Sequence, residues 1–178
     1  IFWSMTLEVN AGDLVSTEEN GLLALNKAPI SAEQFAGLLP LAYQYALTST
    51  GYPKPQSHYK DPVINIVKEG VVKALIGCIG NCGVLGYYDP RDNSINVEVT
   101  ILNLPPVEAG GLLVHEFVHY LQYANGLVFE GCEVRRDAEL EAYRTQHNFL
   151  VAHGVTPTWA WPYSPCTPGT EEATRLKM

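Results

Sequence analysis

The chain has 178 residues, 47% hydrophobic and 17% charged, and a formal net charge of −8 at pH 7. This apolar content excludes a disordered chain, and the length fits one domain. We expect no nucleic-acid partner, because phosphate backbones repel an acidic chain that has no Lys or Arg cluster. We also expect no membrane span, because no segment is apolar over the length of a transmembrane helix. Residues 1–178 are therefore predicted to form one domain, with residues 156–178 as an extended tail packed on it.

The first third of the chain predicts a strand, a helix and a second strand. Residues 2–9 are weakly patterned as a short strand. Residues 31–49 have apolar residues near helical spacing, and Ser31 is a good N-terminal cap. Pro40 lies inside this segment and is expected to kink the helix or split it in two. Residues 63–67 alternate as a strand does.

The middle of the chain predicts a β-hairpin. Residues 84–88 lead into a turn at residues 89–93, where Pro90 and several Asp and Asn residues favour chain reversal. Residues 94–99 lead out of the turn with alternating polarity. We expect Ile95, Val97 and Val99 on one face of this strand and Asn96 and Glu98 on the other.

Two helices are predicted after the hairpin. Residues 106–124 form the first, with Asn103 as its cap and Asn125-Gly126 as its stop. Residues 132–153 form the second, which ends before Gly154. Within the first helix, the small residues Gly110 and Gly111 leave room for a strand or a substrate to approach closely.

The four cysteines predict disulfides. We expect the pairs Cys78–Cys82 and Cys132–Cys166, and hence a secreted or periplasmic protein, because disulfides persist in oxidising compartments. The second bond would pin the C-terminal tail across the start of the last helix. The alternative is four buried free thiols in a cytosolic protein, because spacing alone does not set the pairing.

The first of the two late helices contains the strongest chemical signal, His115-Glu116-Phe117-Val118-His119. Two histidines four residues apart lie on one helical face, so both imidazoles can reach one zinc ion. Glu116 projects beside that face and can act as a general base on a metal-activated water. The alternative is a helix with two histidines that serve only its packing.

This motif resembles the zincin metallopeptidases, and the third ligand decides the branch. The metzincin branch would need Gly at position 122 and His at position 125, where this chain has Gln122 and Asn125. The gluzincin branch supplies a Glu from the next helix, and Glu139 stands twenty positions after His119. Glu141 is the alternative, and because the two are about 200° apart around a helix only one can face the metal.

The resemblance also implies a substrate-binding strand and leaves one position open. Gluzincins have an edge strand before the active-site helix that pairs with an extended substrate, and residues 95–99 occupy that place. Where the family often has an Asp that orients a ligand His, this chain has Tyr143. Its phenol could accept an imidazole N–H, donate to the oxyanion of the reaction, or simply pack. Gln146 and His147 lie one turn further along.

The resemblance implies an α+β, zincin-like fold, with a short mixed sheet and its hairpin packed on a helix bundle that contains two active-site helices. It implies a zinc-dependent metallopeptidase acting on a peptide or protein substrate, with His115, His119 and Glu139 as ligands and Glu116 as base. Tyr143 is the candidate for stabilising the transition state. The alternatives are a non-catalytic metal-binding module on the same scaffold and a zinc hydrolase of a non-peptide substrate.

Overall fold

The computed structural model describes residues 30–78 and 83–158. The strand predicted at residues 2–9 lies outside this part of the chain, as does the predicted tail from residue 159 onward. Within the described residues, no helix is long and apolar enough to cross a membrane.

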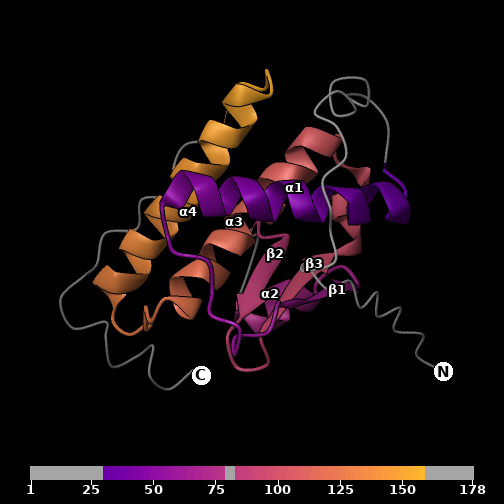
Figure 1. Cartoon of the computed structure of the whole chain (residues 1–178). Helices are drawn as coiled ribbons and strands as arrows, with labels where there is room; N and C mark the ends of the chain where they lie inside the picture. The colour runs from indigo at the N-terminus through magenta and orange to yellow at the C-terminus, as the bar shows by residue number, and fades with distance from the viewer. Residues whose placement is uncertain (1–29, 79–82, 159–178) are drawn as a thin grey trace.

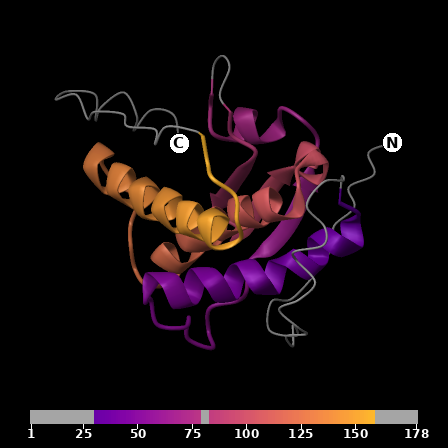
Figure 2. The ribbon, with the colours of Figure 1, turned by 90° about the horizontal axis from the view of Figure 1, so that it is seen from above.

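The described chain is a mixed α+β structure with a small sheet on one side of a group of long helices (Figure 1). Figure 2 shows these helices from above, with α1 along one side of the α3–α4 pair. This confirms the expected α+β class. The elements in chain order are α1 (Ala32–Thr50), β1 (Val63–Val67), α2 (Val71–Leu75), β2 (Gly86–Asp89), β3 (Ser94–Glu98), the 3₁₀ helix η3 (Val99–Asn103), α3 (Pro106–Ala124) and α4 (Cys132–Ala152).

The sheet has the strand order β1-β3-β2. β1 pairs with β3 in parallel and β2 pairs with β3 antiparallel, so the sheet is mixed, as expected, and the predicted hairpin is confirmed. The expectation that residues 95–99 form an open edge is wrong, because β3 is the central strand and is paired on both sides. β2 is the edge strand that lies against α3.

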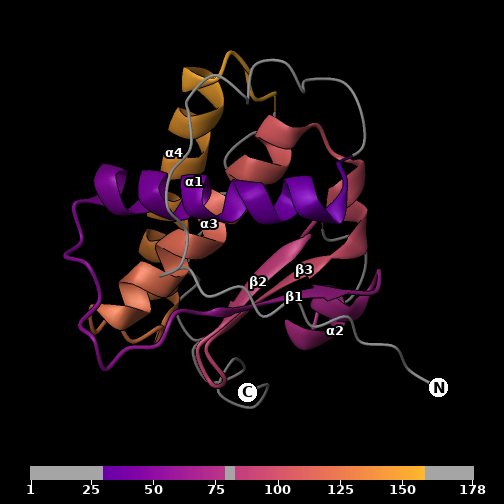
Figure 3. The ribbon, with the colours of Figure 1, turned by 45° about the vertical axis from the view of Figure 1, so that its right-hand side comes forward.

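Every residue of β3 is buried, so both faces of this strand are covered. Its polar residues Asn96 and Glu98 are as buried as Ile95 and Val97. The short helix α2, absent from the sequence expectation, lies on the side of the sheet away from α1 (Figure 3), and the Glu98 carboxylate accepts the N–H of Gly70 at 2.8 Å. Val99 is 45% exposed, because the chain leaves the sheet there and enters η3.

Helix α1 begins at a complete capping box. The Ser31 hydroxyl accepts the Gln34 N–H at 3.1 Å, and the Gln34 side-chain oxygen accepts the Ser31 N–H at 2.8 Å. The expected cap at Ser31 is confirmed. Pro40 does not split the helix, which continues to Thr50 and ends at Gly51 with a φ of 72°.

Helix α3 is buried on nearly every side, as its apolar sequence predicts. Its bounds are those expected, but the expected cap is wrong: Asn103 ends η3, and Pro105 stands at the N-cap. The ring of Phe117 packs edge-on against Tyr43 of α1, with centroids 5.5 Å apart. Helix α3 is therefore the central element against which α1, α4 and β2 pack.

The two glycines of α3 admit helix α4 rather than a strand or a substrate. A Cβ atom at Gly110 would lie 3.2 Å from the Phe149 ring, and one at Gly111 would lie 2.8 Å from Leu150. The expected close approach is thus real, but its partner was wrongly predicted. The consequence is a tight α3–α4 pair, which fixes how side chains on the two helices meet.

Candidate metal centre

The facing sides of α3 and α4 bring together the three residues predicted as metal ligands. One ligand atom each from His115, His119 and Glu139 lies within 4.8 Å of the other two. The two Nε2 atoms are 3.1 Å apart, and the Glu139 carboxylate oxygens lie 3.3 Å from His115 Nε2 and 3.4 Å from His119 Nε2. This group could bind a metal ion.

Glu139 and Glu141 point to different partners. Glu139 faces the imidazole pair and keeps 49% of its side chain exposed. Glu141 accepts hydrogen bonds from the Tyr52 hydroxyl and the Gln122 side-chain amide, each at 2.9 Å. The geometry therefore places Glu139, the residue favoured by spacing, in the cluster and Glu141 outside it.

The charges of the cluster are strongly coupled. Burial lowers the pKa of His119, but the hydrogen bond and charge of Glu139, with help from Glu116 and Gln122, outweigh it and raise that pKa to about 9. Partial burial acts to raise the pKa of Glu139, yet hydrogen bonds from His115 and His119 hold it far below its usual range. The site thus combines a negative carboxylate with an imidazole that binds a proton where a cation would bind.

Glu116 is buried beside this cluster, with 4% of its surface exposed. Burial raises its pKa, against the opposing charges of His115 and His119 and a hydrogen bond from the backbone N–H of Tyr88. A Cβ atom at Gly86 would lie 2.7 Å from Glu116 Oε1. Glu116 therefore lies directly against β2, and a larger residue at position 86 would require the side chain of Glu116 or Leu112 to move.

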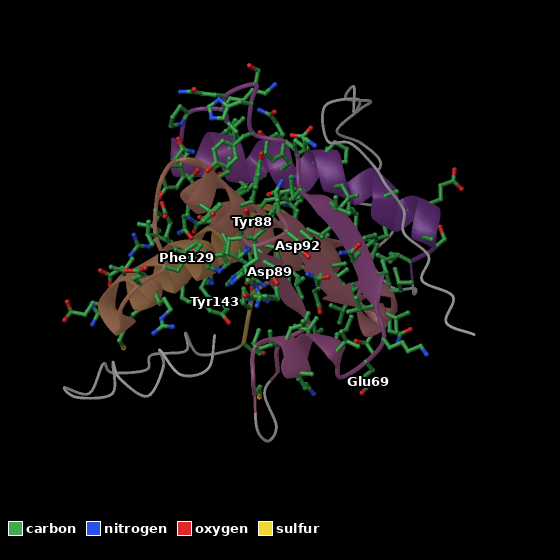
Figure 4. The ribbon with its side chains drawn as sticks, turned by 90° about the horizontal axis from the view of Figure 1, so that it is seen from below. Glu69, Tyr88, Asp89, Asp92, Phe129 and Tyr143 are labelled. Atoms are coloured by element: carbon green, nitrogen blue, oxygen red, sulfur yellow. The ribbon has the colours of Figure 1, made fainter. Side chains whose placement is uncertain are left out.

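Two aromatic rings flank the imidazole pair. Tyr143 of α4 packs edge-on against His115 with centroids 4.4 Å apart, and Phe129 of the α3–α4 loop packs edge-on against His119 at 5.8 Å. Figure 4 labels both rings in the region where β2, α3 and α4 meet. His115 Nδ1 is buried and has no hydrogen-bond partner among the described residues, so Tyr143 does not accept its N–H.

A cavity of about 300 Å³ opens over the cluster. It is lined by His115, Glu116, His119, Glu139, Tyr143, Gln146, Leu112, Ile76 and residues 83–87. A second, more apolar cavity of about 600 Å³ lies beside it and shares residues 83–85, Leu112, Tyr143 and Gln146 with the first. Gln146 thus reaches the cleft, whereas His147 is not part of either lining.

The edge of β2 runs along this cleft. The N–H of Glu98 donates to the Leu85 carbonyl at 2.8 Å, which makes residues 85 and 98 a hydrogen-bonded pair. In an antiparallel ladder the pairs alternate, so Gly86 and Tyr88 direct their backbone groups away from β3. The Tyr88 N–H is used by Glu116, and Gly86 presents its backbone on the side of β2 that has no neighbouring strand among the described residues.

Sequence reasoning missed three features of the site. Gln122 appeared only as a reason to exclude metzincins, yet it contacts His119 Nδ1 at 2.9 Å. Its position three residues after His119, on the same helical face, was the available signal. Phe129 and Gly86 carried no such signal, because a loop ring and a strand glycine reach the cleft only through tertiary packing.

The two cysteines among the described residues, Cys78 and Cys132, are not free thiols. Their predicted partners, Cys82 and Cys166, lie outside the described residues. The pairing, and the oxidising compartment inferred from it, stay predictions.

Comparison of the chain with protein-family models, with curated proteins and with solved structures gives no match. The chemical capacity of the site therefore follows from its own geometry. That geometry is two imidazoles and a carboxylate able to hold a metal ion, beside a buried carboxylate and a strand edge that is unpaired among the described residues.

Proposed function

We propose that this chain is a zinc-dependent peptidase with a gluzincin-like site. The observation that carries the proposal is the convergence of His115, His119 and Glu139 on one point that faces a cleft, with Glu116 buried at its side. This arrangement does not stabilise a helix, because burying charged and polar groups together costs desolvation free energy.

The donor set fits zinc. Two imidazole nitrogens and one carboxylate are a common catalytic zinc set, which leaves one position for water or substrate. Among the described residues, no fourth His, Cys, Asp or Glu joins the group to close it. When bound, zinc supplies Lewis acidity, lowering the pKa of a water and polarising a carbonyl.

Glu116 is placed to move the proton. Its burial raises its pKa, which makes the carboxylate a stronger base than an exposed Glu. It takes the proton of the attacking water and passes it to the leaving amine. The hydrogen bond from the Tyr88 backbone N–H and the contact with Gly86 hold the carboxylate in place for both transfers.

Tyr143 fits the role of an oxyanion donor. Burial, followed by the charges of Glu139 and Glu116, raises the pKa of its phenol to about 12, so the hydroxyl keeps its proton at neutral pH. The residue lines the cavity above the cluster. A neutral phenol at this place can donate to negative charge that develops on the scissile carbonyl oxygen.

The edge of β2, which no other described strand covers, supports a peptide as the substrate. Gly86 presents its backbone N–H and C=O along the cleft beside Glu116, and an extended peptide pairs with such an edge through its main chain. We therefore assign to β2 the substrate-pairing role that the resemblance implies for an edge strand. A non-peptide substrate would make no use of that edge.

The test is a digest of a peptide library by the zinc-loaded protein and by Glu116→Gln. We expect the variant to bind zinc as the wild type does and to lose hydrolysis by roughly a hundredfold or more, because the amide is no base. Glu133→Gln, at an exposed carboxylate early in α4, is the matched control and should stay active. Undiminished hydrolysis by Glu116→Gln would refute the mechanism.

A further inference from the structure

A buried side chain lies behind the candidate ligands on the side away from the cleft. Gln122 is 0% exposed, although a neutral amide is an expensive group to bury in a helix as apolar as α3. Both the oxygen and the nitrogen of this amide have hydrogen-bond partners. Its oxygen lies 2.9 Å from His119 Nδ1, and its nitrogen lies 3.0 Å from the Ala138 carbonyl and 2.9 Å from the Glu141 carboxylate.

These contacts settle which way the amide faces. The carbonyl of Ala138 and the carboxylate of Glu141 can only accept hydrogen bonds, so the NH₂ group must face them. The oxygen of Gln122 must then face His119. Because that oxygen can only accept, His119 Nδ1 carries a proton, and in the neutral ring the lone pair is on Nε2.

The lone pair falls where the candidate centre needs it. His119 Nε2 lies 3.4 Å from Glu139 and 3.1 Å from His115 Nε2, inside the three-residue cluster. Gln122 therefore selects both the orientation of the ring and the tautomer that can ligate a metal. His115 has no equivalent support among the described residues, since its buried Nδ1 is unpartnered there.

The support extends to a third element of the fold. Glu141 is two residues beyond Glu139 on α4. One turn of this helix therefore supplies a carboxylate to the cluster on one side and a hydrogen-bond acceptor to Gln122 on the other. The Tyr52 hydroxyl, from the loop after α1, donates to the same oxygen of Glu141 at 2.9 Å. Tyr52, Glu141 and Gln122 thus form a continuous chain, the Tyr52–Glu141–Gln122 chain, that ends on His119.

We propose that Gln122, held by Glu141 and Tyr52, is the positioning residue that fixes His119 as a metal ligand. In the family that this chain resembles, an Asp often orients a ligand His, and this chain has Tyr143 at that position. We assign the orienting role to Gln122 instead. The inference rests on the proposed metal site, but the tautomer it assigns to His119 is a property of the protein with or without metal.

The first test is therefore spectroscopic and needs no variant. Nitrogen–proton correlation spectra of the metal-free, full-length protein, at a pH where His119 is neutral, should show the proton on Nδ1. A proton on Nε2 in the wild type would overturn the proposal. This result does not depend on zinc binding or on peptidase activity, so it separates the inference from the proposed function.

The second test compares zinc affinity by competition with a chelator. Gln122→Met keeps the size of the side chain but no hydrogen bond, and we expect it to weaken zinc binding by about ten- to a hundredfold. Glu141→Leu should weaken it in the same direction. Glu141→Gln should keep most of the zinc affinity that Glu141→Leu loses, because the new amide oxygen can still accept hydrogen bonds from both Gln122 and Tyr52.

Two outcomes contradict the proposal. One is an unchanged zinc affinity in Gln122→Met, and the other is equal losses in Glu141→Leu and Glu141→Gln, which would make Glu141 a charge partner rather than a hydrogen-bond acceptor. Thermal unfolding of the metal-free variants controls for folding. If Gln122→Met does not fold, Tyr52→Phe tests the outer end of the Tyr52–Glu141–Gln122 chain. An unchanged zinc affinity in Tyr52→Phe, together with a proton on Nε2 of His119, overturns the proposal.

Discussion

Glu139 and Glu141 differ by two positions and have different roles in the structure. Glu139 lies against the imidazole pair and stays half exposed, whereas Glu141 accepts hydrogen bonds from Tyr52 and Gln122. The separation of about 200° around a helix forces this division. Each carboxylate thus finds donors on its own side of α4, and neither is left as an unpartnered charge.

The coupled charges of His119 and Glu139 make metal binding depend on pH. Burial lowers the pKa of His119, but Glu139 outweighs it and raises that pKa to about 9, so in the metal-free protein a proton occupies this group up to about pH 9. A metal must displace that proton. We expect apparent zinc affinity to rise with pH up to about 9 and to level off above it.

Chelator competition at a series of pH values measures this dependence. The metal-free protein should also lose the stabilisation from protonated His119 as pH rises from 6.5, the ordinary pKa, to about 9. A zinc affinity that stays constant over this range would show that no proton is displaced.

At the residue scale, local spacing was enough to predict the candidate ligands, but it did not predict the hydrogen bonds that hold His119. His115 and His119 share a helical face by their four-residue separation, and Glu139 follows at a family-like distance. The contact of Gln122 with Glu141 depends on the approach of two helices, which Gly110 and Gly111 permit and which local spacing does not specify.

At the scale of elements, the strands were predictable and their order was not. The hairpin follows from its turn residues and alternating strands, but whether β2 or β3 lies at the edge depends on the parallel pairing of β3 with β1. That pairing joins strands about thirty residues apart, beyond the reach of local pattern. The same pairing, with the α2 cover, also explains why Asn96 and Glu98 are buried.

The close contact of β2 with α3 yields a prediction for Gly86. A Cβ atom there would lie 2.7 Å from Glu116 Oε1 and 2.8 Å from Leu112. Leu112 can move, but Glu116 is buried, so Gly86→Ala should displace the proposed base and lower the proposed peptide hydrolysis by about ten- to a hundredfold. Zinc affinity should change little, because the atoms nearest to a Cβ atom at Gly86 belong to Glu116 and Leu112 and not to a candidate ligand.

Steady-state hydrolysis and zinc titration of Gly86→Ala check this expectation. Gly83→Ala is the matched control, since a Cβ atom at Gly83 meets no atom of the described residues within 4 Å although Gly83 lines the same cavity. Equal activity of the two variants would show that Gly86 and the β2 edge have no role in the proposed hydrolysis.

At the scale of the molecule, α3 is both the centre of the core and the base of the site. One side of it packs on α1 through Phe117 and Tyr43, another admits α4 at its glycines, and Glu116 meets β2. A metal held by α3 and α4 would cross-link two helices that already pack closely. The same packing that builds the core therefore also sets the distances within the candidate centre.

The metal content of protein purified without added zinc tests this account most directly. We predict one zinc ion per chain in the wild type and its loss in Glu139→Ala, while Glu133→Ala, an exposed carboxylate on the same helix, keeps it. Elemental mass spectrometry of the three proteins measures this. A wild type without bound metal, or equal zinc in Glu139→Ala, would contradict the account.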